Sequence, residues 1–276
     1  MKKIRHFLNL HELSQSDMHE IVSESHRLKK NYGKFTLKKK KILAMIFEKP
    51  STRTRVSFEV GMKTINGDVV ILDQNDTQLA RGESLNDTIK VLSRYVDIIM
   101  YRGSDEKKLY EISKSSNVPI INGLTNQSHP CQIIADLMTL EENFKDINKI
   151  SLCWLGDGNN VCNSWIHACK HYDFNLNISC PKGFFPKKQV LDKVKKNTVK
   201  LYENPEEAIL GADVLITDTW ESMGMNKQDD TLKKFKKFQI NSSLLNKTQK
   251  KSLILHCLPA PVSYTHLRAH ETQRNR

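Results

Sequence analysis

The sequence predicts an α/β protein with two doubly wound parallel-sheet domains and an active site in the cleft between them. Short apolar runs of strand length alternate along the chain with segments of helical periodicity, which is typical of parallel sheets covered on both faces. One polar segment, residues 143–148, interrupts this alternation of strands and helices, which then resumes. Polar side chains follow several of the expected strands, and the carboxyl ends of parallel strands are where such sheets bind ligands.

The first domain is predicted over residues 1–145. Ser14 or Ser16 can cap a helix that runs to about Leu28. The apolar run 42–47 is short enough for a buried strand, and Pro50 then ends it and starts a turn. A helix from this turn to about residue 67 follows. The remaining strands are expected at 69–72, 98–101 and 118–121, with helices at 84–95, at 106–115 and from 130 onward.

The second domain is predicted over residues 146–260, where the alternation of strands and helices repeats. The spacing of apolar residues predicts strands at 150–155, 176–180, 214–217 and 253–255. It predicts helices at about 161–171, 186–196, 206–210 and 231–238, the second of them rich in lysine. The two halves therefore have the same kind of architecture.

Composition argues against several other classes of protein. The 276 residues are 38% hydrophobic and 27% charged, which is ordinary for a soluble globular protein. No apolar run approaches the roughly 20 residues that span a bilayer, and the basic start lacks the apolar core of a signal peptide. The net charge of +12 comes from dispersed lysines without interleaved aromatic residues. We therefore expect a cytoplasmic protein without membrane or nucleic-acid partners, whose field attracts anionic substrates.

The cysteines and histidines do not predict a disulfide framework or a metal site. None of the six cysteines forms a C-x-x-C pair, which favours a reducing compartment. His167 and His171 have the i, i+4 spacing of a helical metal pair, but no third ligand lies nearby in the sequence. We expect neither a metal nor a cofactor.

The segment 47–59, FEKPSTRTRVSFE, has the pattern of an anion site. A strand, a turn and a helix start follow one another, so free backbone N–H groups and the positive end of the helix dipole converge after the turn. Arg53 and Arg55 add two guanidinium groups whose shape matches phosphate oxygens. A capped helix with solvated arginines is the alternative. The position after a buried strand favours phosphate binding.

Six further polar residues follow expected strands. They are Arg102, His129, Gln132, Asn160, Asp218 and Cys257. Taken singly, Cys257 suits a buried strand cysteine and His129 a helix cap. The segment Gly156-x-Gly158-x-x-Val161 is an incomplete dinucleotide fingerprint, and the next strand ends in Pro181 instead of an acidic residue. A nicotinamide-dependent dehydrogenase is therefore the weaker interpretation.

Four ordered motifs resemble those of the aspartate/ornithine carbamoyltransferase family. The segment 51–59 is similar to the family's carbamoyl phosphate loop, and His129-Pro130-x-Gln132 to its second shared motif. Two later motifs, 218–224 (DTWESMG) and 256–259 (HCLP), resemble the ornithine-specific members. The resemblance covers about residues 1–260.

The resemblance implies carbamoyl transfer from carbamoyl phosphate to the δ-amine of L-ornithine. The products would be L-citrulline and phosphate, formed through a tetrahedral intermediate, and the pathway would be arginine metabolism. The implied catalytic residues are Arg102, His129, Asp218 and Cys257. Those implied for carbamoyl phosphate are Ser51, Thr52, Arg53, Thr54, Gln78, Arg102, His129, Gln132, Cys257 and Leu258. Those implied for ornithine are Asn160, Asp218, Ser222 and Met223.

Within this set the resemblance implies separate roles. Thr54, Arg102 and His129 would polarise the carbonyl oxygen. Cys257 would lie near the attacking amine. A homotrimer is implied, in which the loop carrying Gln78 reaches a neighbouring subunit's site. A different amine acceptor, such as putrescine or acetylornithine, and a non-catalytic homologue remain alternatives.

The residues after Ala260 differ from the rest of the chain. They show no apolar periodicity, and 262–272 matches one reading frame of a common transposase adapter. We therefore expect 261–276 to be a non-native, adapter-derived tail, with a divergent natural tail as the alternative. The resemblance implies a further arginine and a final helix after this point. On that expectation the chain as written has impaired activity.

Overall fold

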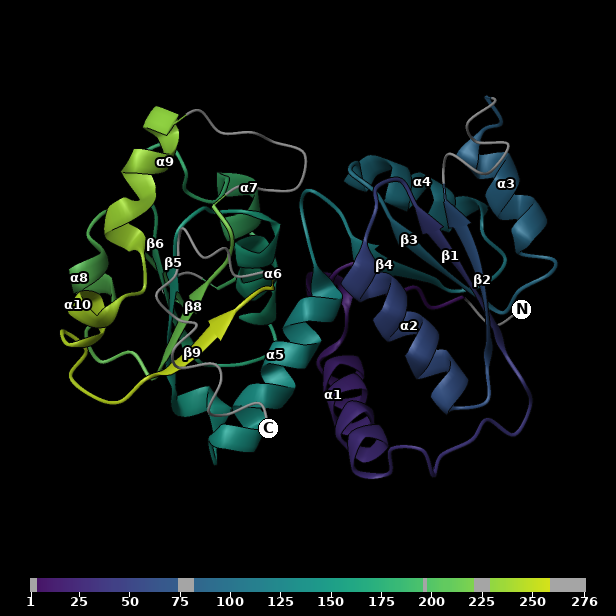
Figure 1. Cartoon of the computed structure of the whole chain (residues 1–276), viewed down its shortest axis with the longest axis horizontal. Coiled ribbons are helices and arrows are strands. Elements are labelled where there is room, and N and C mark those ends of the chain that lie inside the picture. Colours follow the sequence, from purple (N-terminus) through teal and green to yellow (C-terminus); the bar gives the residue numbers. More distant parts are fainter. Residues whose placement is uncertain (1–3, 74–81, 196–197, 221–228, 259–276) are drawn as a thin grey trace. The chain divides into compact units, whose positions relative to one another are not determined.

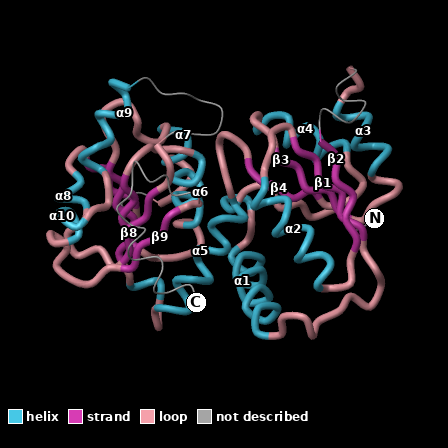
Figure 2. The backbone as a smooth tube through the Cα atoms, viewed as in Figure 1, coloured by secondary structure: helices cyan, strands magenta, loops and turns pink. Residues whose placement is uncertain are grey.

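The computed structural model describes residues 4–73, 82–195, 198–220 and 229–258 (Figure 1). The chain divides into two compact units, and the boundary follows Met138, inside helix α5 (Pro130–Asn143). Each unit contains one sheet made only of parallel strands, flanked by helices (Figure 2). The predicted fold class of two parallel-sheet α/β units is confirmed.

The sheet of the first unit has four strands in the order β2-β1-β3-β4. The central strand β1 is buried on both faces from Leu43 to Phe47, as its apolar sequence predicts. The register aligns the carboxyl ends, since Phe47 pairs with Asp73 on one side and with Arg102 on the other. The strands are β1 (Ile42–Phe47), β2 (Asp68–Asp73), β3 (Ile98–Arg102) and β4 (Ile120–Leu124).

Helices cover both faces of this sheet. Leu43, Met45 and Phe47 point to one face and pack with Phe58 and Met62 of α2. Alternate residues of the same strand, Ala44 and Ile46, point to the other face, where they join a cluster with α3 and α4. The helices are α1 (Gln15–Lys30), α2 (Thr52–Thr64), α3 (Leu85–Leu92) and α4 (Glu106–Ser115), preceded by the short 3₁₀ helix η1 (Leu10–Glu12).

The second unit has a five-stranded parallel sheet in the order β7-β6-β5-β8-β9. One face packs against α8 and α10, and Figure 1 shows α6 on the opposite face. The strands are β5 (Ser151–Leu155), β6 (Asn175–Ser179), β7 (Val199–Tyr202), β8 (Val214–Thr217) and β9 (Leu253–His256). The helices are α6 (Asn160–Ala168), α7 (Lys188–Leu191), α8 (Pro205–Ala208), α9 (Asp229–Phe235) and α10 (Ser242–Leu245), with 3₁₀ turns η4 (Ile147–Lys149) and η5 (Lys236–Phe238).

The structure departs from the predicted elements in several places. Strand β7 was not predicted, because this edge strand is partly exposed and follows a run of lysines. The predicted helix 186–196 is only the single turn α7. Strand β4 begins two residues late and includes the buried Asn122, whose side-chain nitrogen donates to the Leu8 carbonyl and to Ser128 Oγ.

Among the described helices, none has both the length and the apolar character needed to cross a membrane.

Candidate active site

The strand order of each sheet marks where a ligand crevice should form. In the order β2-β1-β3-β4 the chain leaves β1 toward one edge and later returns on the other side, so the switch point lies between β1 and β3. In the second unit the corresponding point lies between β5 and β8. Doubly wound sheets bind ligands beyond the carboxyl ends of the strands at such points. Thr54, Arg102, Asn160 and Asp218 lie at or after the carboxyl ends of these four strands, whereas His129 follows β4 and Cys257 follows β9.

Helix α2 begins directly after the turn that follows β1, and its N-terminus lacks a side-chain cap. Ser51 occupies the N-cap position with extended backbone, but its side chain accepts no hydrogen bond from α2. By contrast, Ser14 and Ser84 cap α1 and α3 through their hydroxyls. The first N–H groups of α2 are therefore not occupied by Ser51. They can bind an anion.

Arg102 brings a buried positive charge to the same place. It is the last residue of β3 and only 5% exposed, and its Nη1 donates to Thr54 Oγ1 in the first turn of α2, at 2.6 Å. Burial lowers the pKa of Arg102, because the charged form loses solvation there. A buried guanidinium beside a helix N-terminus gives the site a strong preference for an anionic ligand.

His129 lies close enough to Arg102 for the charges to interact. Burial, and secondarily the charge of Arg102, lower the pKa of His129 to about 3, so its imidazole is neutral near pH 7. It immediately precedes α5, whose first turn contains Gln132. The Gln132 side chain donates from Nε2 to Asp136 Oδ1 at 3.0 Å. The structure thus brings Thr54, Arg102 and His129 together.

Arg53 and Arg55 differ in their surroundings. Both are exposed, but Arg55 Nη1 donates to Asp73 Oδ2 at 3.0 Å, at the carboxyl end of β2. The sequence pattern alone treats the two arginines alike, as phosphate ligands. The ion pair shows that the Arg55 guanidinium binds Asp73, whereas the pattern assigns it to phosphate.

In the second unit, Asp218 is the centre of a polar cluster after β8. Asn159 Nδ2 donates to Asp218 Oδ2 at 2.8 Å, and the Thr219 backbone N–H donates to Oδ1 at 2.8 Å. Burial raises the pKa of Asp218, whereas these two hydrogen bonds and the charge of His256 act in the opposite direction. A partly buried carboxylate held in this way can bind an ammonium or amine group.

Asn159 and His256 were not among the predicted site residues. Asn159 caps α6, since its Oδ1 accepts from the N–H groups of Val161 and Cys162, and its amide reaches Asp218. The N-cap preference for asparagine could have distinguished it from Asn160, which is the first residue of the helix. His256 ends β9 opposite Thr217, the residue before Asp218, so register brings it near.

The other predicted residues divide into two groups. Cys257 follows β9 and is partly buried, and Leu258 is exposed. Gln78, Ser222 and Met223 lie outside the described residues, as does the tail after residue 258. Within the described part of the chain, no group of three His, Cys, Asp or Glu side chains is arranged to hold a metal ion.

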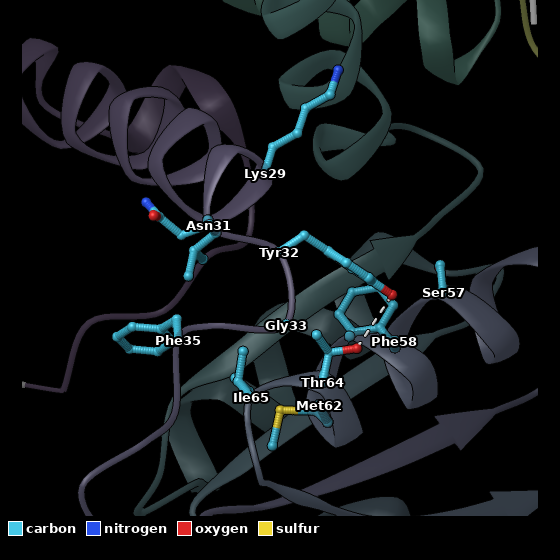
Figure 3. Close-up of a pocket in the computed structure, with 12 residues that line it drawn as sticks. Lys29, Asn31, Tyr32, Gly33, Phe35, Ser57, Phe58, Met62, Thr64 and Ile65 are labelled. Atoms are coloured by element: carbon cyan, nitrogen blue, oxygen red, sulfur yellow. Dashed lines mark hydrogen bonds between the residues drawn. The ribbon is translucent and has the colours of Figure 1, made fainter.

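A separate apolar cavity of about 440 Å³ lies between the end of α1, the loop that follows it and one face of α2 (Figure 3). Phe35, Phe58 and Met62 contribute apolar walls, and the Thr64 hydroxyl donates to Tyr32 Oη at 3.4 Å. The cavity borders the later turns of α2 and contains none of the predicted site residues. We do not assign it to the candidate active site.

Comparison with known proteins agrees with the resemblance of the motifs. Residues 5–142 match the family described as aspartate/ornithine carbamoyltransferase, carbamoyl-P binding domain, and residues 148–267 match its Asp/Orn binding domain. Ornithine carbamoyltransferase of Nitrobacter winogradskyi is 43% identical over 265 residues, which are 94% of this chain and 86% of the relative.

Solved structures give the same result. Ornithine carbamoyltransferase from Pyrococcus furiosus superposes with a TM-score of 0.89 at 37% identity, covering 96% of this chain and 88% of that one. The anabolic ornithine carbamoyltransferase from Campylobacter jejuni gives a TM-score of 0.90 at 34% identity, covering 97% and 91%.

Proposed function

We infer the function of this chain from one premise: it belongs to the aspartate/ornithine carbamoyltransferase family. The enzyme transfers the carbamoyl group of carbamoyl phosphate to the δ-amine of L-ornithine, which yields L-citrulline and phosphate. The observation that supports the donor site best is the buried Arg102 guanidinium bonded to Thr54 at the uncapped start of α2. Other amine acceptors and a non-catalytic role are not favoured.

The first unit supplies the groups that carbamoyl phosphate requires. The phosphate binds to the N-terminus of α2 through Ser51, Thr52, Arg53 and Thr54. Arg102, His129 and Thr54 surround the carbonyl oxygen, where negative charge develops in the tetrahedral intermediate. Because burial keeps His129 neutral, it acts as a hydrogen-bond donor and not as a cation. Gln132 contacts the carbamoyl amide.

The second unit supplies the groups that ornithine requires. Asp218 binds an amino group of ornithine through the carboxylate that Asn159 and Thr219 hold in place. Asn160, Ser222 and Met223 complete this side, and Cys257 lies near the attacking δ-amine. The amine nitrogen bonds to the carbonyl carbon and loses a proton. The intermediate then collapses, and phosphate leaves with the electron pair of the broken carbon–oxygen bond.

These roles assign one substrate to each predicted domain. We assign carbamoyl phosphate binding to residues 1–145 and ornithine binding to residues 146–260. The reaction requires the two substrates to meet. A cytoplasmic homotrimer, in which the loop carrying Gln78 reaches a neighbouring site, belongs to the same proposal. The product places the enzyme in arginine metabolism and amino-acid biosynthesis.

Citrulline formation from carbamoyl phosphate and L-ornithine tests the function directly. Purified protein should form citrulline with ornithine and should form little carbamoylated product with putrescine or acetylornithine at equal concentration. Calorimetric binding of carbamoyl phosphate without turnover would instead indicate a non-catalytic homologue. Preferential use of putrescine or acetylornithine would contradict the assigned acceptor.

A further inference from the structure

Glu48 is a largely enclosed carboxylate at the switch point of the first unit, and the mechanism above gives it no role. It is the first residue after β1 and precedes the turn that leads to Ser51. Its side chain is 16% exposed, whereas that of its ion-pair partner Lys108 is 53% exposed. A charged group is enclosed to this extent only where protein groups replace its hydration.

The carboxylate of Glu48 connects the end of β1 to the turn after β3. Its Oε2 accepts a hydrogen bond from the Ser104 backbone N–H at 3.2 Å, and its Oε1 accepts from Lys108 Nζ at 3.2 Å. Gly103 fits tightly between these groups: a Cβ there would lie 2.7 Å from Glu48 Oε2 and 2.2 Å from the Tyr101 hydroxyl. The turn after β3 is therefore packed directly onto this carboxylate.

These contacts hold the backbone at Arg102 and just after it. The Glu48 backbone N–H donates to the carbonyl of Arg102 itself at 3.0 Å, and the Glu48 carboxylate accepts from the N–H of Ser104, two residues further along the chain. The Arg102 guanidinium in turn donates to Thr54, six residues after Glu48. One residue thus fixes the start of the phosphate-binding turn and the backbone from which Arg102 extends.

We propose that Glu48 is a positioning residue that aligns the Arg102 guanidinium with Thr54 and thereby sets the geometry of the carbamoyl phosphate site. The proposal rests on the proposed function. It assigns the effect to the hydrogen bond with Ser104, because that bond joins the backbone on which Arg102 is carried. The exposed ion pair with Lys108 contributes little.

Glu48→Met is the informative substitution, since methionine keeps a similar length but has no oxygen to accept the hydrogen bond from Ser104. The value of kcat/KM for carbamoyl phosphate should fall by about tenfold or more. The KM for ornithine should stay within about twofold of wild type, because the hydrogen bonds of the Glu48 carboxylate to Ser104 and Lys108 lie within the first unit. Glu48→Asp, which keeps the charge but not the reach, gives the same comparison if the methionine variant is not recovered folded.

Lys108→Met is the matched control, because it removes the ion pair and leaves the Ser104 hydrogen bond. It should retain wild-type kinetics within about twofold. Wild-type carbamoyl phosphate kinetics in Glu48→Met would overturn the proposal. An equal loss for both substrates, together with a lower unfolding temperature, would also overturn it, since this would indicate a purely structural role.

Binding of inorganic phosphate separates this proposal from the proposed function. Calorimetry with phosphate tests Glu48 whether or not wild-type protein forms citrulline. The proposal requires roughly tenfold weaker phosphate binding in Glu48→Met and unchanged binding in Lys108→Met. Equal phosphate affinity in wild type and Glu48→Met would contradict it.

Discussion

Replacing Arg102 by methionine should separate catalysis from stability. Arg102 is only 5% exposed as a residue, and its guanidinium is bonded to Thr54 at 2.6 Å, so a substrate oxyanion would meet it in a water-poor site. Removing one donor of this kind costs about 10²–10³ in kcat. The same substitution removes a buried positive charge. Burial lowers the pKa of Arg102, which means that keeping the guanidinium charged costs free energy in the folded state. The free energy of unfolding should stay equal or increase.

The assay combines citrulline turnover with thermal unfolding in the presence and absence of phosphate. A ligand at about 100 times its Kd stabilises the native state by about 2.7 kcal/mol, and this gain should be lost in Arg102→Met. Lys63→Met is the matched control, because Lys63 is exposed on α2 and pairs with Glu59. Undiminished turnover in Arg102→Met would refute the reasoning. So would a loss of turnover that simply follows a lower unfolding temperature.

Two further predictions concern stability. The pKa of His129 falls to about 3 on folding, so between that value and the ordinary histidine pKa the unfolded chain binds more protons than the folded chain. The free energy of unfolding should therefore decline as pH falls below about 6.5. In urea unfolding, His129→Gln should remove about 2 kcal/mol of the stability loss between pH 7 and 5. Gly61 lies within α2 beside the apolar cavity, and a methyl group added to it would meet no atom within 4 Å, so Gly61→Ala should stabilise by about 1 kcal/mol. Gly67→Ala should destabilise, because its Cβ would lie 3.1 Å from the Lys41 carbonyl oxygen and 3.2 Å from the Met62 carbonyl oxygen, and a stabilising result there would contradict the packing argument.

Much of the fold follows from local pattern. Fully apolar runs such as 42–47 indicate strands buried on both faces, and the alternation of strands with helices leaves a parallel sheet as the consistent solution. The predicted helix 106–115 agrees with α4 at both ends, because Asp105 caps it as expected for an N-cap residue. Strand β7 could not be predicted from local pattern, because its segment is short and partly exposed. It forms a strand because it pairs with β6.

The candidate site was predictable where a residue follows a strand, and less so where partners are distant in sequence. Arg102 and Thr54 meet because parallel register aligns the ends of β1 and β3. The bond from Asn159 to Asp218 joins residues 59 positions apart, and the contact of Glu48 with Ser104 joins residues 56 apart. No local motif carries such information. Only the strand order and register determine these pairs.

Steady-state kinetics of Asp218→Asn with both substrates varied test the central claim most directly. The claim is that each switch point binds one substrate of a single carbamoyl transfer. Asparagine removes the negative charge that would bind the amino group of ornithine, so the KM for ornithine should rise by about tenfold or more. The KM for carbamoyl phosphate should remain within about twofold of wild type, because no group of the first unit is changed. An unchanged ornithine KM, or an equal rise for both substrates, would contradict the account.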